Sequence, residues 1–155
     1  MRIMFVCHGN ICRSPMAEMI FKFMLAERGI RGVTVSSSAT STEEIYRGVG
    51  NPIYPPAVSE LRRHGIPVEE RRAVQLTRGD YERYDLFLLM DGRNLRGIKS
   101  IFPSDPEGKV GMLLDYAGGG DVADPWYSGD FEAAYSDIYR GCEGLLRELE
   151  KHGLL

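Results

Sequence analysis

Apolar residues along the chain fall into short uninterrupted runs that alternate with stripes of helical spacing. Four runs, at residues 3–6, 33–37, 86–90 and 110–114, are apolar or β-branched and predict strands. Two stripes, at residues 16–24 and 131–149, repeat every three or four positions and predict amphipathic helices. Strands that alternate with helices are typical of an α/β fold, in which helices cover both faces of a parallel sheet.

Polar residues, glycines and prolines set the expected boundaries of these elements. Ser14 and Pro15 suit the start of the first helix, as its cap and its first residue, and Gly29 suits its end. We also expect a helix at residues 57–64, a helix that begins after a cap at Thr77, and a helix at residues 94–100. Loops are expected at residues 41–56 and 116–129. Because no repeat or linker interrupts the pattern, we expect one domain spanning residues 1–155.

Composition and charge narrow the function classes. The chain is 43% hydrophobic and 26% charged, which is typical of a globular protein and not of a disordered one. A net charge of -3 gives no general attraction to nucleic acid or to an anionic membrane, so an anion site must be local. We expect no signal peptide and no membrane span. Three cysteines, an odd number, favour a reducing, cytoplasmic setting over a disulfide framework.

Candidate functional residues follow the ends of three predicted strands. Cys7 ends the first strand, Asp91 follows the third, and Asp124 lies in the loop after the fourth. Ligands of open α/β sheets bind beyond the carboxyl ends of the strands. We therefore expect these three segments to converge on one rim of the sheet.

The segment C-H-G-N-I-C-R, residues 7–13, leads from the first strand into the first helix. Such a loop points backbone N–H groups and the positive end of the helix dipole at one spot, where an anion binds. Gly9 lets the backbone come close, and the guanidinium of Arg13 matches phosphate oxygens. The same field stabilises a thiolate, so we expect Cys7 to be a nucleophile, with Ser14 hydrogen-bonded to it. The expected phosphate-binding residues are His8, Gly9, Asn10, Ile11, Cys12 and Arg13.

Other interpretations of this segment are weaker. Zinc needs three or four ligands, and the chain offers no second cluster beside Cys7, His8 and Cys12, so we expect no metal. A thioredoxin-type redox pair needs a shorter C-x-x-C spacing. The alternative without a functional site is that Cys7 is a small buried hydrophobic residue and that Arg13 is a solvated surface residue.

The sequence resembles the low-molecular-weight protein tyrosine phosphatases. Their signature loop matches residues 6–18, and further matches lie at residues 37–41, 64–66, 90–95 and in the D-P-W-Y segment at residues 124–127. The resemblance implies a three-layer fold, flavodoxin-like or phosphotyrosine phosphatase I-like, with a four-stranded parallel sheet and helices on both faces. It also implies hydrolysis of phosphotyrosine in proteins and of small aryl phosphates through a phosphocysteine intermediate, with neither metal nor cofactor.

The resemblance assigns the roles of the catalytic residues. Cys7 attacks phosphorus, Arg13 and the loop amides hold the phosphoryl oxygens, and Asp124 protonates the leaving phenolate before it helps to activate water. Asn10 holds the loop, and Ser37 supports Asn10. As partners we expect phosphotyrosine-containing proteins and phosphate-like anions, with a monomeric chain.

The resemblance also assigns residues around the pocket. Ile11, Trp126 and Tyr127 are expected to line it, the two aromatic rings at its mouth. Cys12 is expected to form a reversible disulfide with Cys7 under oxidation. Cys142 lies on the apolar stripe of the last helix, where we expect it to pack.

One segment and one residue depart from the family pattern. Residues 42–56 form a longer stretch than usual, in a region that walls the pocket. Arg71 stands near a position where many relatives carry histidine, and it is expected to pair with Glu18.

Three other functions compete with tyrosine phosphatase activity. Arsenate reductases of this fold need a further cysteine pair, which Cys142 alone cannot supply. Protein arginine phosphatases have a small threonine where this chain has Ile11, whose bulk favours the flat ring of phosphotyrosine. A phosphate-binding module without turnover needs neither Cys7 nor Asp124, so the presence of both favours an enzyme.

Overall fold

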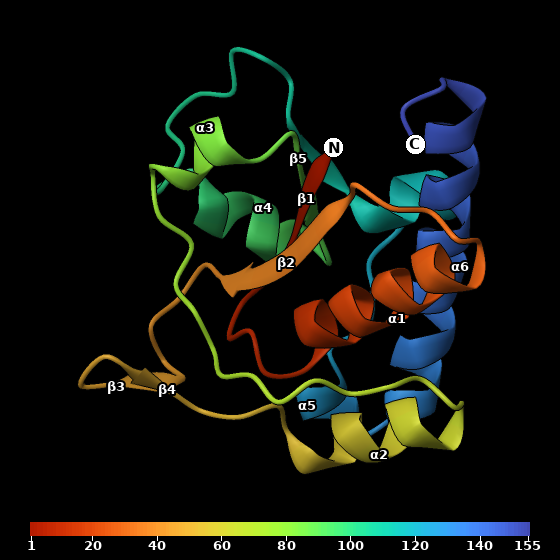
Figure 1. Cartoon of the computed structure of the whole chain (residues 1–155). Coiled ribbons are helices and arrows are strands. Elements are labelled where there is room, and N and C mark those ends of the chain that lie inside the picture. The colour runs from red at the N-terminus through yellow and green to blue at the C-terminus, as the bar shows by residue number, and fades with distance from the viewer.

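Four parallel strands form the main sheet of the computed structural model, which describes residues 1–155 (Figure 1). Their order across the sheet is β2-β1-β5-β6, with bounds Thr34–Ala39, Arg2–Cys7, Leu86–Leu89 and Val110–Met112. The helices are α1 (Arg13–Glu27), α2 (Pro55–Arg63), α3 (Asp80–Arg83), α4 (Gly92–Ile98), η1 (Leu113–Ala117), α5 (Pro125–Ser128) and α6 (Phe131–Lys151). None of these helices combines the length and the apolar character that crossing a bilayer requires.

Alternate residues of β1 pack against different layers of helices. Ile3 and Phe5 are completely buried in a cluster with side chains from α1, α2 and α6. Met4 and Val6 point to the other face, into a cluster that includes Tyr81 of α3 and Ile98 of α4. Both faces of the sheet are therefore covered, which confirms the predicted three-layer fold (Figure 1).

The topological switch point of the sheet lies between β1 and β5. The chain continues from β1 to β2 on one side of this point and from β5 to β6 on the other. β1 pairs in parallel with β2 on one side and with β5 on the other, and Cys7 lies opposite Ala39 at the carboxyl end. The loops after β1 and after β5 therefore leave the same edge in opposite directions, and the space between them is where this class of fold binds ligands.

Helix α1 begins earlier than the sequence predicts, and this changes the role of Ser14. The helix begins at Arg13 and its cap position is Cys12, so the expected capping by Ser14 is wrong. The Ser14 hydroxyl contacts the Cys7 sulfur and the Asn10 side chain and so does not cap a backbone N–H. The end of α1 is as predicted: Gly29 has φ 65°, and the backbone N–H of Ile30 bonds the carbonyl of Leu25.

The structure also corrects three smaller predictions. Thr77 does not cap α3: its backbone N–H donates to the carboxylate of Asp80. The expected loop at residues 41–56 contains a hairpin of β3 (Ile45–Tyr46) and β4 (Val49–Gly50), which projects from the body of the molecule (Figure 1). The fourth predicted strand ends early, because η1 begins at Leu113 and continues into the start of the second expected loop, and this loop also contains α5 directly after Asp124.

Candidate active site

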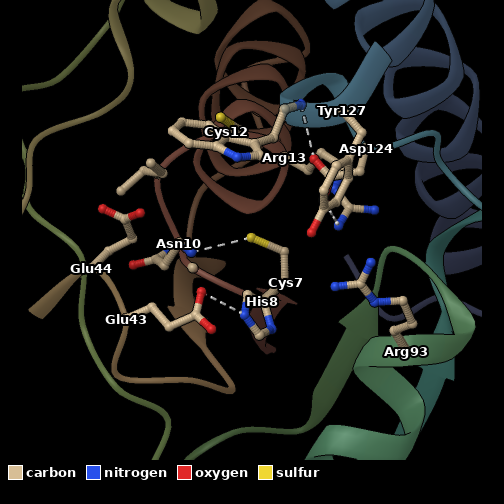
Figure 2. A pocket seen from close by; sticks show the side chains of 13 residues that line it. Cys7, His8, Asn10, Cys12, Arg13, Glu43, Glu44, Arg93, Asp124 and Tyr127 are labelled. Atoms are coloured by element: carbon tan, nitrogen blue, oxygen red, sulfur yellow. Dashed lines mark hydrogen bonds and ion pairs between the residues drawn. The ribbon is translucent and has the colours of Figure 1, made fainter. Parts of the chain in front are cut away.

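The Cys7 sulfur lies inside the turn that joins β1 to α1. The backbone N–H of Asn10 donates to this sulfur over 3.3 Å (Figure 2), and the Ser14 hydroxyl oxygen lies 2.9 Å from the sulfur. Asn10 has φ 61°, a left-handed conformation that asparagine tolerates better than most residues, and this turns its N–H inward. The turn therefore holds the sulfur between a backbone N–H and a hydroxyl group, in a position suited to a nucleophile.

The side chain of Asn10 fixes the loop from below. Its amide nitrogen donates to Ser14 Oγ at 2.8 Å and to Ser37 Oγ at 3.0 Å. Its amide oxygen accepts from Arg71 Nη2 at 2.5 Å and from the backbone N–H of Val74 at 3.0 Å. Because Asn10 is 1% exposed, these four bonds hold the strained turn in one conformation.

A buried ion pair lies beneath this asparagine. Arg71 Nη1 donates to Glu18 Oε1 at 2.5 Å, which confirms the pairing expected from the sequence. Glu18 is 4% exposed and also accepts from Ser37 Oγ and from Lys22 Nζ, both at 2.6 Å. Arg71 thus connects a buried carboxylate to the loop that holds the sulfur.

Arg13 is held at the floor of the pocket by acceptors from two further segments. Its Nη1 donates to Asp91 Oδ2 at 2.7 Å and to the carbonyl of Val122 at 2.8 Å, and its Nη2 lies 3.4 Å from Asp124 Oδ2. Burial raises the pKa of Asp91, but hydrogen bonds from Arg13 and the backbone of Asn94 outweigh it, so the net pKa is below its ordinary value. Asp91 is therefore a carboxylate that keeps the guanidinium in place.

Asp124 reaches the pocket from the amino end of α5. One carboxylate oxygen accepts from the backbone N–H of Trp126 at 3.0 Å, while the other is directed at Arg13. Trp126 and Tyr127 follow at the mouth and are 55% and 71% exposed. Trp126 packs on Tyr54, with 5.1 Å between ring centroids. The pocket therefore has a carboxylate at its side and an aromatic wall above it (Figure 2).

These groups line one open cavity, whose empty space is about 530 Å³ including the part open to solvent. It is lined by the whole loop predicted to bind phosphate, by Asp124 and by the two aromatic residues after it. Ser14 and Ser37 are not part of the lining and act from below the loop. The structure adds Glu43, Glu44 and Arg93 to the lining: the first two lie in the segment 42–56 that was expected to wall the pocket, and Arg93 was not indicated by the sequence.

The ring of His8 has a different partner from the one a metal site would need. Its Nε2 lies 2.9 Å from Glu43 Oε2 (Figure 2).

The second sulfur of the loop belongs to Cys12, which is buried. Burial, followed by the charges of Cys7 and Asp124, raises the pKa of Cys12 to about 12. Cys12 is therefore a neutral thiol at physiological pH. Cys142 is completely buried in α6, and burial raises its pKa as well, as expected for a residue that only packs.

Comparisons with known proteins agree on one family. The model of the family described as low molecular weight phosphotyrosine protein phosphatase matches residues 2–154. YfkJ of Bacillus subtilis, named a low molecular weight protein-tyrosine-phosphatase, is 36% identical over 152 residues, covering 96% of each chain. The Homo sapiens low molecular weight phosphotyrosine protein phosphatase is 37% identical over 153 residues, covering 94% of each.

Solved structures give the same result. The crystal structure of YfkJ matches with a TM-score of 0.90 at 35% identity, covering 98% of this chain and 96% of that one. A structure of YwlE, described as an arginine phosphatase with a phosphorylated active-site serine, matches with a TM-score of 0.80 at 31% identity, covering 97% of each. The chain belongs to the low molecular weight phosphotyrosine protein phosphatase family.

Proposed function

We propose that this protein tyrosine phosphatase hydrolyses phosphotyrosine in proteins, and small aryl phosphates, through a phosphocysteine formed on Cys7. One observation carries the assignment of the nucleophile: the Cys7 sulfur lies within hydrogen-bond distance of the Asn10 N–H and the Ser14 hydroxyl. Arg13 and Asp124 line the same cavity. The proposed unit is one phosphatase domain that spans residues 1–155.

In the first step the Cys7 thiolate attacks phosphorus, and the bond from phosphorus to the phenolic oxygen breaks. Loop N–H groups and the N–H groups of Arg13 that do not bond protein acceptors hold the phosphoryl oxygens as their charge shifts. Asp124 in its protonated form gives its proton to the leaving phenolate. Asp91 contributes by holding Arg13 in register with the loop.

In the second step water attacks the phosphocysteine. Asp124, now a carboxylate, accepts a proton from the water, phosphate leaves, and the thiolate is restored. The Ser14 hydroxyl and the Asn10 N–H stabilise the sulfur as it becomes a leaving group.

The shape of the cavity favours phosphotyrosine over phosphoarginine. Ile11 is 8% exposed, lines the cavity, and packs with Ala73 and Tyr54. Its branched side chain is expected to favour a flat ring, which Trp126 at the mouth of the cavity can contact. Exchange of Ile11 for threonine is expected to raise turnover of phosphoarginine relative to phosphotyrosine.

The proposal extends to the cellular setting. We place the protein in the cytoplasm, acting as a monomer on phosphotyrosine-containing proteins and without a nucleic-acid partner. Three free cysteines support a reducing compartment, and the net charge of -3 supports the absence of nucleic-acid binding. Gel filtration tests the monomer, which has a mass of 17.4 kDa.

A direct assay tests the function. Hydrolysis of p-nitrophenyl phosphate and of phosphotyrosine, phosphoserine and phosphoarginine peptides is measured in the presence of a chelator. We expect the phosphotyrosine peptide to be the best peptide substrate, Cys7→Ser to be inactive, and Asp124→Asn to slow phosphotyrosine turnover by a factor of about 10² to 10⁴. Turnover that survives Cys7→Ser would refute the proposed nucleophile, and a preference for phosphoarginine would refute the proposed substrate.

A further inference from the structure

Opposite charges lie on opposite sides of the pocket mouth. Glu43 and Glu44, just before the β3–β4 hairpin, line one side, and Arg93 of α4 reaches toward the cavity from the other (Figure 2). Arg93 and Tyr127 meet at this rim, with the guanidinium carbon 5.6 Å from the centroid of the tyrosine ring. The mouth is therefore polarised, whereas the chain as a whole carries only a small net charge.

The cations on this side have no carboxylate partner within the protein. Arg93 contacts the ring of Tyr127 but forms no ion pair, and Arg96 and Lys99, which form none either, extend the exposed basic surface along α4 and to the residue after it. The carboxylates across the mouth do have partners: Glu43 pairs with His8, and Glu44 accepts from Asn51 at 2.7 Å. An external anion can thus be bound on the α4 side without breaking an ion pair.

We propose that Arg93, with Arg96 and Lys99 behind it, binds an acidic side chain that flanks the phosphotyrosine of the substrate. The preferred substrates are then phosphotyrosine segments with Asp or Glu within about two residues on one side, since an extended chain advances about 3.3 Å per residue. This inference rests on the proposed function, because the phosphotyrosine itself positions the segment across the mouth.

The charges also set the direction in which the segment lies. A carboxylate beside Arg93 gains a charge-assisted contact that is bidentate in its best geometry. The same carboxylate on the other side would face Glu43 and Glu44, where like charges repel. An acidic residue is therefore expected to help on one side of the phosphotyrosine and not on the other.

Peptide kinetics test this inference. Four phosphotyrosine peptides are compared. One is neutral, one has two acidic residues before the phosphotyrosine, one has two acidic residues after it, and one has lysines at the acidic positions. The measured quantity is the ratio of kcat/KM for each charged peptide to kcat/KM for the neutral peptide. Dividing by the neutral peptide removes any change in the phosphate site itself.

Wild-type enzyme is expected to favour one of the two acidic peptides by about threefold to fivefold. Arg93→Ala is expected to reduce that ratio to near one, and Arg93→Glu to shift the preference to the lysine peptide. The preference is also expected to disappear at about 1 M salt, which screens exposed charges. Arg31→Ala is the matched control: Arg31 is exposed and lies before β2, at the opposite edge of the sheet, so its removal should leave the ratios unchanged.

Two results would overturn the inference. One is an acidic preference that is absent in wild type or unchanged in Arg93→Ala. The other is an equal loss by Arg93→Ala on every peptide, which would assign Arg93 to the phosphate. Failure of the proposed function looks different, because wild-type enzyme would then not hydrolyse the neutral phosphotyrosine peptide at all.

Discussion

Replacing Arg71 by leucine tests how the catalytic loop is supported. The change removes the ion pair to the buried Glu18 and the hydrogen bond to the amide oxygen of Asn10. The variant is therefore expected to lose both stability and activity.

The size of the loss follows from what remains around Glu18. Removing one partner of a buried ion pair costs about 3 to 5 kcal/mol, because a charge is left uncompensated. Here Lys22 and Ser37 still contact Glu18, so we expect about 2 to 3 kcal/mol. For a chain of this length that corresponds to a decrease in Tm of about 5 to 10 °C. Misplacement of Asn10 is expected to lower kcat/KM by about tenfold or more.

Thermal unfolding and steady-state kinetics measure both effects. The matched control is Arg28→Leu, which removes the pair of Arg28 with Glu150 at 2.6 Å, on side chains that are 53% and 38% exposed. An exposed pair contributes less than about 1 kcal/mol. Adding Glu18→Gln to Arg71→Leu should recover part of the lost stability, because the uncompensated charge is gone. Equal losses in the two leucine variants, or no recovery in the double variant, would refute the reasoning.

Three further predictions concern packing, pH and oxidation. The Gly144→Ala variant should have a much lower urea midpoint of unfolding than the Gly141→Ala variant. A Cβ at position 144 meets the backbone oxygen of Tyr116, whereas a Cβ at position 141 meets only the side chain of Leu113, which can move. Equal midpoints would contradict this. Burial raises the pKa of Asp105, but the hydrogen bond from Tyr81 and the backbone bonds from Val110 and Lys109 outweigh it, so its pKa is lowered. Its stabilisation is present above about pH 4 and is lost as the pH falls further, so Asp105→Asn should flatten the acid-side dependence of unfolding free energy, and an unchanged slope would count against it. Hydrogen peroxide should convert the Cys7 thiolate to a sulfenic acid, which then reacts with the Cys12 thiol to form a disulfide and water. Dithiothreitol should restore the activity of the wild-type enzyme. Equal recovery of activity in the Cys12→Ser variant would disprove the protective role of Cys12.

Hydrophobic patterning predicts the fold well because its signal is carried by long, buried elements. The four strands and the helices α1 and α6 follow from apolar runs and stripes, to within one or two residues of the observed bounds. The hairpin of β3 and β4 and the short α5 were not predicted. They bury little, and their few residues are polar or flanked by glycine and proline, so no periodicity marks them.

Some features of the catalytic site are also predicted by the local sequence, and others depend on contacts between distant residues. The loop at residues 7–13 is continuous in sequence, and its chemistry follows from strand, loop and helix alone. The contact of the Ser14 hydroxyl with the Cys7 sulfur was predicted in the same way, and only the additional role of Ser14 as a helix cap was wrong. The roles of Asp91 toward Arg13 and of Arg71 toward Asn10 depend on contacts between residues more than sixty positions apart. Arg93 and Glu43 carry no motif and become visible only at the mouth of the folded pocket.

The measurement that tests the account most directly is the mass of the enzyme trapped during turnover. Asp124→Asn is mixed with p-nitrophenyl phosphate, quenched in acid and digested. Nitrophenolate leaves without needing a proton from Asp124, whereas hydrolysis of the intermediate needs that residue as a base, so the phosphoenzyme should accumulate. The account predicts one added phosphoryl group on the peptide that contains Cys7, absent from the double variant that also carries Cys7→Ser. Turnover without any phosphorylated cysteine, or a phosphoryl group on another residue, would contradict it.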